Sequence, residues 1–83
     1  MAMVVEAFDK KGTKFKVGSE VEIKGTFYYV FDIVIDDESG KALKILCIDR
    51  DLAGYTLSQT SLATPTGNYE PDILKLKRKL AKK

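Results

Sequence analysis

The stretch from Gly18 to Asp49 constrains the fold most strongly, because three β-type segments follow one another there with only short turns between them. Glu20–Lys24 alternates polar and apolar residues, which is typical of a half-buried strand. Gly25-Thr26 predicts a tight connection to the longest strand candidate, Phe27–Asp36. A third strand is expected over Lys41–Asp49. The pattern predicts a mainly β protein with a small antiparallel sheet.

Period-two alternation assigns the two faces of the long strand Phe27–Asp36. Its odd-numbered positions are all apolar or aromatic and are expected to face the core, whereas its even-numbered positions include two carboxylates and are expected to be partly wet. In Lys41–Asp49, apolar residues occur on both faces, which predicts a central strand. The expected core residues are Val21, Ile23, Phe27, Tyr29, Phe31, Ile33, Leu43, Ile45 and Cys47.

The turns of the chain are marked by glycine. Asp37–Gly40 is typical of a hairpin turn with Gly40 at positive φ, and Asp9–Gly12 predicts another turn between a first strand over Met3–Phe8 and an alternating segment over Thr13–Val17. Further along, a turn is expected over Asp51–Gly54.

The C-terminal third carries weaker patterns. Tyr55–Ser58 predicts a short strand, whereas the Ser- and Thr-rich stretch Gln59–Asn68, which holds Pro65 and Gly67, predicts a loop with Leu62 turned inward. From Pro71 onward a short helix is expected, because proline and aspartate suit a helix start and lysines suit its end.

Size and charge indicate one small domain with a basic tail. The chain has 83 residues, which suits a single domain, expected over residues 1–76. Residues 1–74 hold eight Lys or Arg against twelve Asp or Glu, whereas residues 75–83 hold six Lys or Arg and no acid. The body is therefore acidic, and residues 77–83 form a basic C-terminal tail.

The segment from Lys16 to Asp49 resembles the front half of an SH3-like small barrel of the KOW, Tudor-like or bacterial SH3 kind. The residues that carry the resemblance are Val17-Gly18-Ser19-Glu20-Val21, Gly25-Thr26-Phe27-Tyr28-Tyr29-Val30, Ile33 and the Asp37–Gly40 hairpin. The turn at Pro71-Asp72-Ile73-Leu74 is similar to the short helical turn near the end of many such barrels. The resemblance implies an antiparallel barrel of about five strands with a short C-terminal helix or helical turn. The chain has no Trp and no ALYDY motif, so it departs from the polyproline-binding SH3 domains.

The sequence contains few of the residue types that enzymes use for catalysis. The absence of His removes the commonest general base, the commonest metal ligand and the Ser-His and Cys-His nucleophile pairs. Cys47 lies between two apolar residues and is expected to be a buried thiol in a reducing compartment. No run of about 20 apolar residues is present, and the N-terminus lacks the layout of a signal peptide. We expect a cytoplasmic, non-enzymatic protein without a cofactor or metal and without membrane contact.

Two kinds of partner fit this sequence. The leading hypothesis is a protein–protein adaptor, of the kind found among bacterial or mobile-element accessory proteins, which binds through a sheet face or edge. Its candidate partner-binding residues are Tyr28, Val30, Tyr55 and Tyr69. The alternative is a nucleic-acid-binding module of KOW or Tudor-like type, in which the tail contacts phosphates. Its candidate residues are Lys75, Lys77, Arg78, Lys79, Lys82 and Lys83.

Overall fold

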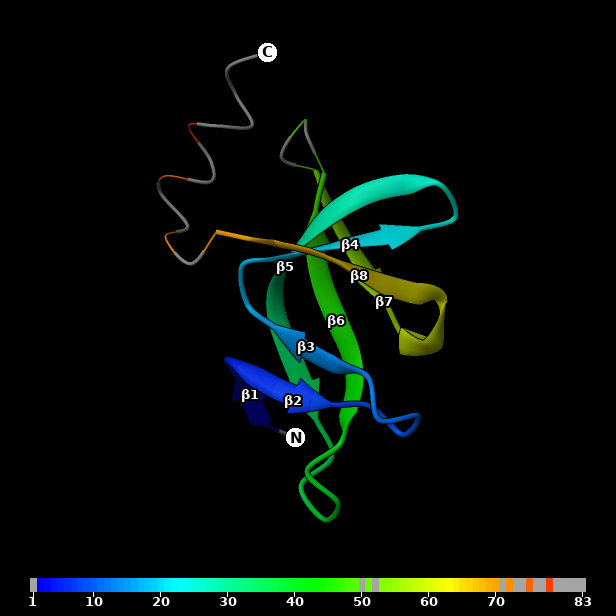
Figure 1. The fold of residues 1–83 in the computed structure, drawn as a ribbon. Helices are drawn as coiled ribbons and strands as arrows, with labels where there is room; N and C mark the ends of the chain where they lie inside the picture. The colour runs from blue at the N-terminus through cyan, green and yellow to red at the C-terminus, as the bar shows by residue number, and fades with distance from the viewer. Residues whose placement is uncertain are drawn as a thin grey trace.

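The computed structural model describes residues 2–49, 51, 53–70, 72, 75 and 78 (Figure 1). The protein is mainly β, as the sequence predicted, with two antiparallel sheets. The strands are β1 (Ala2–Val4), β2 (Glu6–Phe8), β3 (Lys14–Lys16), β4 (Ser19–Ile23), β5 (Thr26–Ile35), β6 (Ala42–Ile48), β7 (Gly54–Leu57) and β8 (Ala63–Tyr69). One 3₁₀ turn, η1 (Thr60–Leu62), precedes β8.

The main sheet is a four-stranded meander with a returning strand. Its order is β7-β6-β5-β4-β8, and β1 pairs with the C-terminal half of β5 on the same side as β4. Strands β2 and β3 form a separate two-stranded sheet. Because β7 and β8 lie at the two ends of the strand order, the sheet is open, and the closed barrel implied by the resemblance is not formed.

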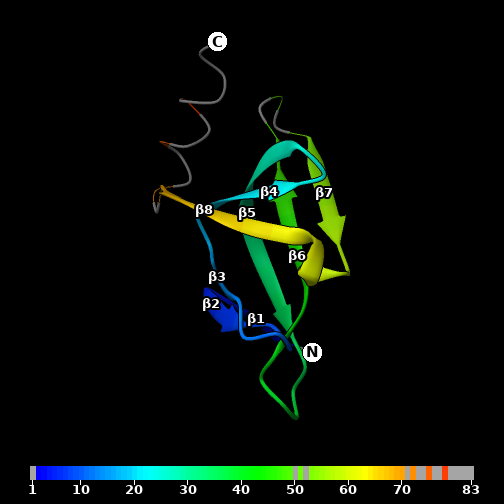
Figure 2. The same cartoon turned by 45° about the vertical axis from the view of Figure 1, so that its right-hand side comes forward.

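The core lies between the β2–β3 hairpin and one face of the main sheet, here called the inner face. In Figure 1, β2 and β3 cross in front of β5, and in Figure 2 they lie to the left of β5. Phe15 of β3 is fully buried against this face. The core residues of the two layers are Ala7, Phe15, Val21, Ile23, Val30, Ile33, Ala42, Ile45, Cys47, Leu57 and Ala63.

A β-bulge in the long strand β5 reverses the expected face assignment over its first half. Val30 is opposite Cys47 and Asp32 is opposite Leu46, so Phe31 is the extra residue of the bulge. Ahead of the bulge the even-numbered positions face the core, and beyond it the odd-numbered positions do.

The core prediction is therefore wrong at some positions. Phe27 and Phe31 belong to the opposite face of the sheet, here called the outer face, where Phe27 is 48% exposed and Phe31 is half-buried. Tyr29 lies on the same face but is buried, as expected, in a second, small core cluster with Ile48. Val30, expected to be partly wet, has no exposed surface. Leu43 is half-buried because the β5–β6 register shifts a second time beside it.

The polar stretch expected to be a loop is mostly strand β8. This strand pairs with β4 at the end of the sheet order, where Pro65 is tolerated because an edge strand needs no second set of backbone donors. Only Ala63 of β8 is buried, so no alternation of apolar residues marks the strand in the sequence. Leu62 is 41% exposed and does not turn inward as expected, whereas Thr60 is buried.

The N-terminal strand differs from the sequence prediction, and the predicted C-terminal helix can be compared with the structure at only a few residues. The single N-terminal strand is divided by a bend at Val5 into β1 and β2. The expected helix from Pro71 falls mostly outside the described residues; within them, the Lys75 N–H donates a hydrogen bond to Asp72 Oδ1 at 3.3 Å. In the described part of the chain, no helix has the length and apolar character needed to cross a bilayer.

Candidate interaction surface

The outer face of the main sheet carries a group of large apolar side chains. Tyr29 and Ile48, opposite each other on β5 and β6, are each only 9% exposed and form a small second core, and Phe31 packs half-buried against them. Register places Leu46 on the same face, two residues from Ile48 along β6. We call these residues the outer patch: Phe27, Tyr29, Phe31, Leu46 and Ile48.

A half-open groove of about 400 Å³ lies on the outer patch beside strand β7. Its walls come from three neighbouring strands, β5, β6 and β7, and its lining is mostly apolar. Gly54 lies opposite Ile48 in the β6–β7 register, so no side chain fills the sheet surface at that point. The groove is lined by Phe31, Leu46, Cys47, Ile48, Gly54, Tyr55 and Thr56.

Carboxylates lie beside part of the outer patch. Glu20 and Glu22 of β4 are opposite Tyr29 and Phe27, and Asp32 of β5 is opposite Leu46. Lys44 of β6 lies on the same face, two residues from Leu46. The border of the outer patch is therefore charged, and it is acidic along β4.

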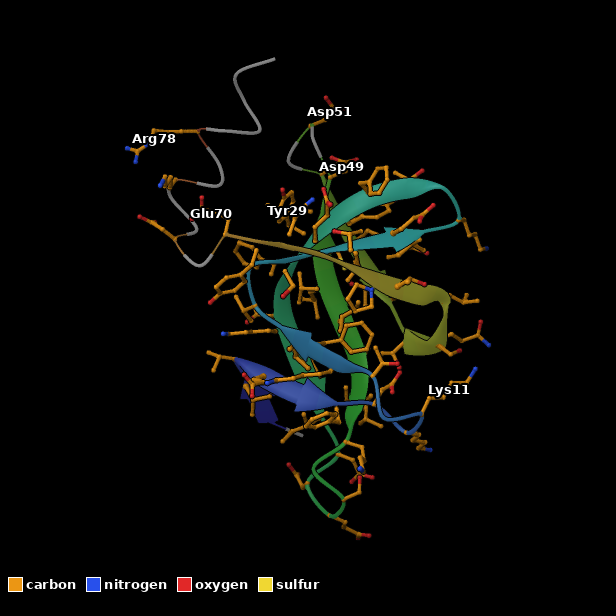
Figure 3. All side chains as sticks on the ribbon, in the orientation of Figure 1. Lys11, Tyr29, Asp49, Asp51, Glu70 and Arg78 are labelled. Carbon is orange, nitrogen blue, oxygen red and sulfur yellow. The ribbon has the colours of Figure 1, made fainter. Side chains whose placement is uncertain are left out.

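A carboxylate closes the loop that follows β6. Asp49 follows Ile48 directly, and its Oδ1 accepts hydrogen bonds from the backbone N–H groups of Asp51 at 2.9 Å and Ala53 at 3.0 Å (Figure 3). This carboxylate therefore closes the loop that leads into Gly54, the residue at the open floor of the groove.

The structure brings together two of the four tyrosine and valine positions expected to bind a partner. The rings of Tyr28 and Tyr55 stack, with centroids 5.2 Å apart and planes at 24°. Tyr28 packs against the core cluster, and Tyr55 is 39% exposed at the end of the inner face. The two tyrosines therefore form one stacked pair at the edge of the core.

The other two expected positions lie apart from that pair. Val30 is fully buried in the core, so its side chain cannot contact a partner, and the bulge at Phe31 is the reason. Tyr69, at the end of β8, is 46% exposed, and the Lys16 ammonium lies 4.5 Å from its ring centroid. This cation–π contact links β3 to β8 and gives Tyr69 a structural partner.

The expected nucleic-acid-binding residues are mostly outside the described part of the chain. Lys75 and Arg78 are described, whereas Lys77, Lys79, Lys82 and Lys83 are not.

The single cysteine is confirmed as a buried thiol. Cys47 is 1% exposed, and burial raises the pKa of its thiol from 9.0 to about 12. A thiol with so high a pKa carries almost no thiolate at neutral pH and is a poor nucleophile. Within residues 2–49, 51, 53–70, 72, 75 and 78, no three metal-binding side chains gather in one place.

The sequence did not reveal the groove residues, because apolar residues on both faces of a strand usually indicate that both faces are buried. Leu46 and Ile48 alternate with the core residues of β6, and apolar residues on both faces predicted a central, covered strand. In the structure, one of those faces is the floor of an open groove. Apolar residues on both faces of a strand can thus also indicate a surface that binds another molecule.

Comparisons with known proteins give no match: no family model fits the sequence, and no curated protein or solved structure is similar to it.

Proposed function

We propose that this protein is a small non-enzymatic binding module, a protein–protein adaptor that holds its partner on the outer patch. The observation that carries the proposal is the apolar groove of about 400 Å³ between Phe31, Leu46, Ile48 and Gly54. Contiguous apolar surface on a small protein is characteristic of interaction sites, and aromatic side chains are enriched there.

The anatomy of the surface supports a protein partner. An apolar centre with a charged border is the usual arrangement of a protein–protein interface, because the centre is desolvated and the rim stays wet. Here Phe31 and Leu46 form the centre, and Glu22 and Asp32 lie on the border. The same carboxylates oppose a nucleic-acid ligand on this face, since they repel phosphates.

The proposal extends to the fold family. The meander β4–β7, the 3₁₀ turn η1 and the return of β8 to β4 support an SH3-like arrangement of five strands, to which β1 and the β2–β3 hairpin are added. The short helical turn that resembles the one in such barrels is then η1, ahead of the last strand, rather than the segment at Pro71. Fold alone assigns no ligand, and the groove carries the functional proposal.

A charged substitution inside the groove tests the adaptor function. Tagged wild-type protein, Leu46→Lys and the control Ser61→Lys are used for affinity capture from native lysate of the source cells. Ser61 is exposed on η1, outside both the groove lining and the outer patch, and receives the same added charge. We expect proteins that are retained by wild type and Ser61→Lys to be lost from Leu46→Lys, with circular dichroism showing that all three fold. Equal retention by all three would contradict the proposal.

The second candidate is nucleic-acid binding, which the Tyr28–Tyr55 stack favours. Partly exposed aromatic rings stack bases, and the basic residues of the C-terminus would neutralise phosphates. A salt titration against mixed single-stranded DNA and RNA separates the two functions. Binding at low salt that falls steeply as salt rises would support the second candidate, and absence of binding at low salt would remove it.

A further inference from the structure

The outer patch is buried at one end, although the second sheet, β2–β3, covers the inner face instead. Tyr29 and Ile48 are each only 9% exposed, and Phe31 is the only described hydrophobic residue that packs against the pair. On the same face Phe27 is 48% exposed. The burial is therefore local to the Tyr29–Ile48 end of the outer patch, and it calls for a covering segment beyond the described strands.

The chain leaves the sheet beside this end of the outer patch. The Glu70 N–H donates a hydrogen bond to the Gly18 carbonyl at 2.8 Å, and the Gly18 N–H donates to the Val30 carbonyl at 2.9 Å. Because Val30 lies between Tyr29 and Phe31, only β4 separates the end of β8 from the outer patch. Figure 3 shows Glu70 and Tyr29 at the same end of the molecule.

The chain that remains after Glu70 is long enough to cross the outer patch. We call residues 71–83 the C-terminal segment. As a helix, a segment of this length spans about 20 Å, because each residue adds about 1.5 Å. Three neighbouring strands are together narrower than this, since strands lie about 5 Å apart.

The C-terminal segment has one apolar side and one basic side when its sequence is placed on a helix. Lys75 and Arg78 have helical backbone and are exposed, and the Arg78 side chain points away from the sheet (Figure 3). At about 100° per residue, helical spacing places Ile73, Leu76 and Leu80 on the side opposite to Lys75 and Arg78. An amphipathic helix of this kind buries its apolar side against another surface.

We propose that the C-terminal segment folds back over the outer patch of its own chain and packs Ile73, Leu76 and Leu80 on Tyr29 and Ile48. The basic side of the helix then faces the solvent, in agreement with the exposure of Lys75 and Arg78. Ile48 also lines the groove, so the docked segment narrows access to the groove, and a partner has to displace it. The docking does not depend on the adaptor function, whereas this regulation of access rests on it.

The test compares two variants of the full-length protein. The segment variant, Leu76→Ser with Leu80→Ser, removes apolar contacts from the docked side. The matched control, Lys75→Ser with Arg78→Ser, places the same two serines on the exposed side, so both variants lose a similar amount of helix propensity. Every strand pair of the sheet precedes these positions, so both proteins should fold.

Two readouts report on the outer patch. In ¹⁵N-labelled protein, we expect the amide signals of Tyr29 and Ile48 to shift in the segment variant and to stay at their wild-type positions in the control. The signal of Phe15, in the inner core, should stay in place in both. The dye 8-anilinonaphthalene-1-sulfonate binds exposed apolar surface, and its fluorescence should rise at least about twofold with the segment variant only.

Several outcomes would overturn the docking. Equal spectra and equal dye binding for the segment variant and the control would do so. Wild-type signals of Tyr29 that change with protein concentration would show that a second copy supplies the cover, and would overturn it as well. If the double substitution unfolds the protein, Leu80→Ser alone decides by the same two readouts, because it leaves Ile73 and Leu76 in place.

Affinity capture separates the docking from the adaptor function. The segment variant should retain more of the Leu46-dependent proteins than the control does, because the competing segment no longer covers Ile48. If the spectra respond but capture stays the same, the docking stands and the regulation of access is lost. If capture is insensitive to Leu46 in every variant, the adaptor function is lost with its regulation, and the spectra still decide the docking.

Discussion

Thr60 donates a hydrogen bond from its hydroxyl to Asp9 Oδ2 at 3.2 Å, across 51 residues of sequence. Asp9 is 1% exposed, and its other oxygen, Oδ1, accepts from the backbone N–H groups of Lys11 at 3.0 Å and Thr13 at 2.8 Å. One buried carboxylate therefore closes the turn of the β2–β3 hairpin and ties that hairpin to η1. The bond between Thr60 and Asp9 therefore helps to hold the β2–β3 hairpin over the core.

The chain contains a second copy of the same loop without the long-range bond. Asp49 Oδ1 accepts from the N–H groups two and four residues ahead, those of Asp51 and Ala53, just as Asp9 does. Its own N–H donates to the Ala53 carbonyl at 3.1 Å, and the Asp9 N–H donates to the Thr13 carbonyl at 2.9 Å. The two loops differ in burial and in Thr60, which makes one a control for the other.

Replacing Asp9 with alanine should therefore cost much more stability than replacing Asp49. Asp9→Ala removes three hydrogen bonds and leaves buried donors without acceptors, which should lower the free energy of unfolding by about 2–4 kcal/mol. Asp49→Ala acts on a more exposed loop, where water replaces the carboxylate, and should cost about 1 kcal/mol. Urea denaturation measures both. Equal costs would contradict a structural role for the contact with Thr60.

Phe15 and Phe31 should differ in how much stability is lost when each is replaced with alanine. Phe15 has no exposed surface and lies in the main core, so Phe15→Ala should cost about 3–5 kcal/mol. Phe31 is half-buried on the outer face, so Phe31→Ala should cost only about 1–2 kcal/mol, because less apolar area returns to water. Chemical denaturation of the two variants checks this order. The reverse order would indicate that Phe31 faces the core, as the alternation in the sequence predicted.

The strand pattern of this protein could be predicted from sequence wherever one face is buried and the other is wet. Val21 and Ile23 alternate with Glu20 and Glu22, and the alternation placed both valine and isoleucine correctly in the core. In β5 both faces carry large apolar residues, so alternation alone could not show where the bulge at Phe31 changes the side of the strand. An extra residue shifts the alternation by one position, and this shift is visible in the sequence only where the two faces of the strand differ in polarity.

Strand β8 and the groove could not be predicted for a related reason. β8 is held mainly by pairing with β4, and its exposed side chains are free to be polar; Thr66 and Asn68, for example, donate hydrogen bonds to Glu20 Oε1 at 2.6 and 2.8 Å. The groove depends on Gly54 facing Ile48, a relation set by the β6–β7 register. Of the expected contact residues, Tyr28 and Tyr55 were found to lie together because they flank one end of the core.

The hairpin between β5 and β6 should be sensitive to Gly40 and insensitive to its neighbour. Gly40 has φ of 71°, as expected from the sequence, and its N–H donates to the Asp36 carbonyl at 2.8 Å. Gly40→Val should cost about 1–3 kcal/mol through backbone strain, because a β-branched residue rarely adopts positive φ. Glu38→Ala should change stability by less than about 0.5 kcal/mol, since only the Glu38 backbone N–H is used, in a bond to Asp36 Oδ1. Similar losses in the two variants, measured in urea, would show that the turn does not depend on Gly40.

The buried thiol should make stability fall at alkaline pH. Burial raises the pKa of Cys47 from 9.0 to about 12, so between these values the unfolded chain releases the thiol proton while the folded chain keeps it. The unfolded state is then favoured, and the free energy of unfolding decreases as pH rises above 9.0. We expect wild type to lose more stability than Cys47→Ala between about pH 7 and about pH 10 in urea titrations. Identical losses would show that the thiol is not the responsible group.

Deletion of residues 77–83 should preserve the fold and separate the two candidate functions. The last strand ends at Tyr69, so every strand pair of the sheet remains after the cut. The deletion removes five of the six basic residues that follow position 74, and the charge changes from +2 to −3. Because neutralised phosphates supply most non-specific affinity, any low-salt binding to nucleic acid should be lost, whereas a partner that depends on Leu46 should still be captured. Thermal melting and both binding assays check the outcome. A truncated protein that does not fold would show that the removed segment is structural, and its charges would then be ordinary surface charges rather than a tail that binds phosphates.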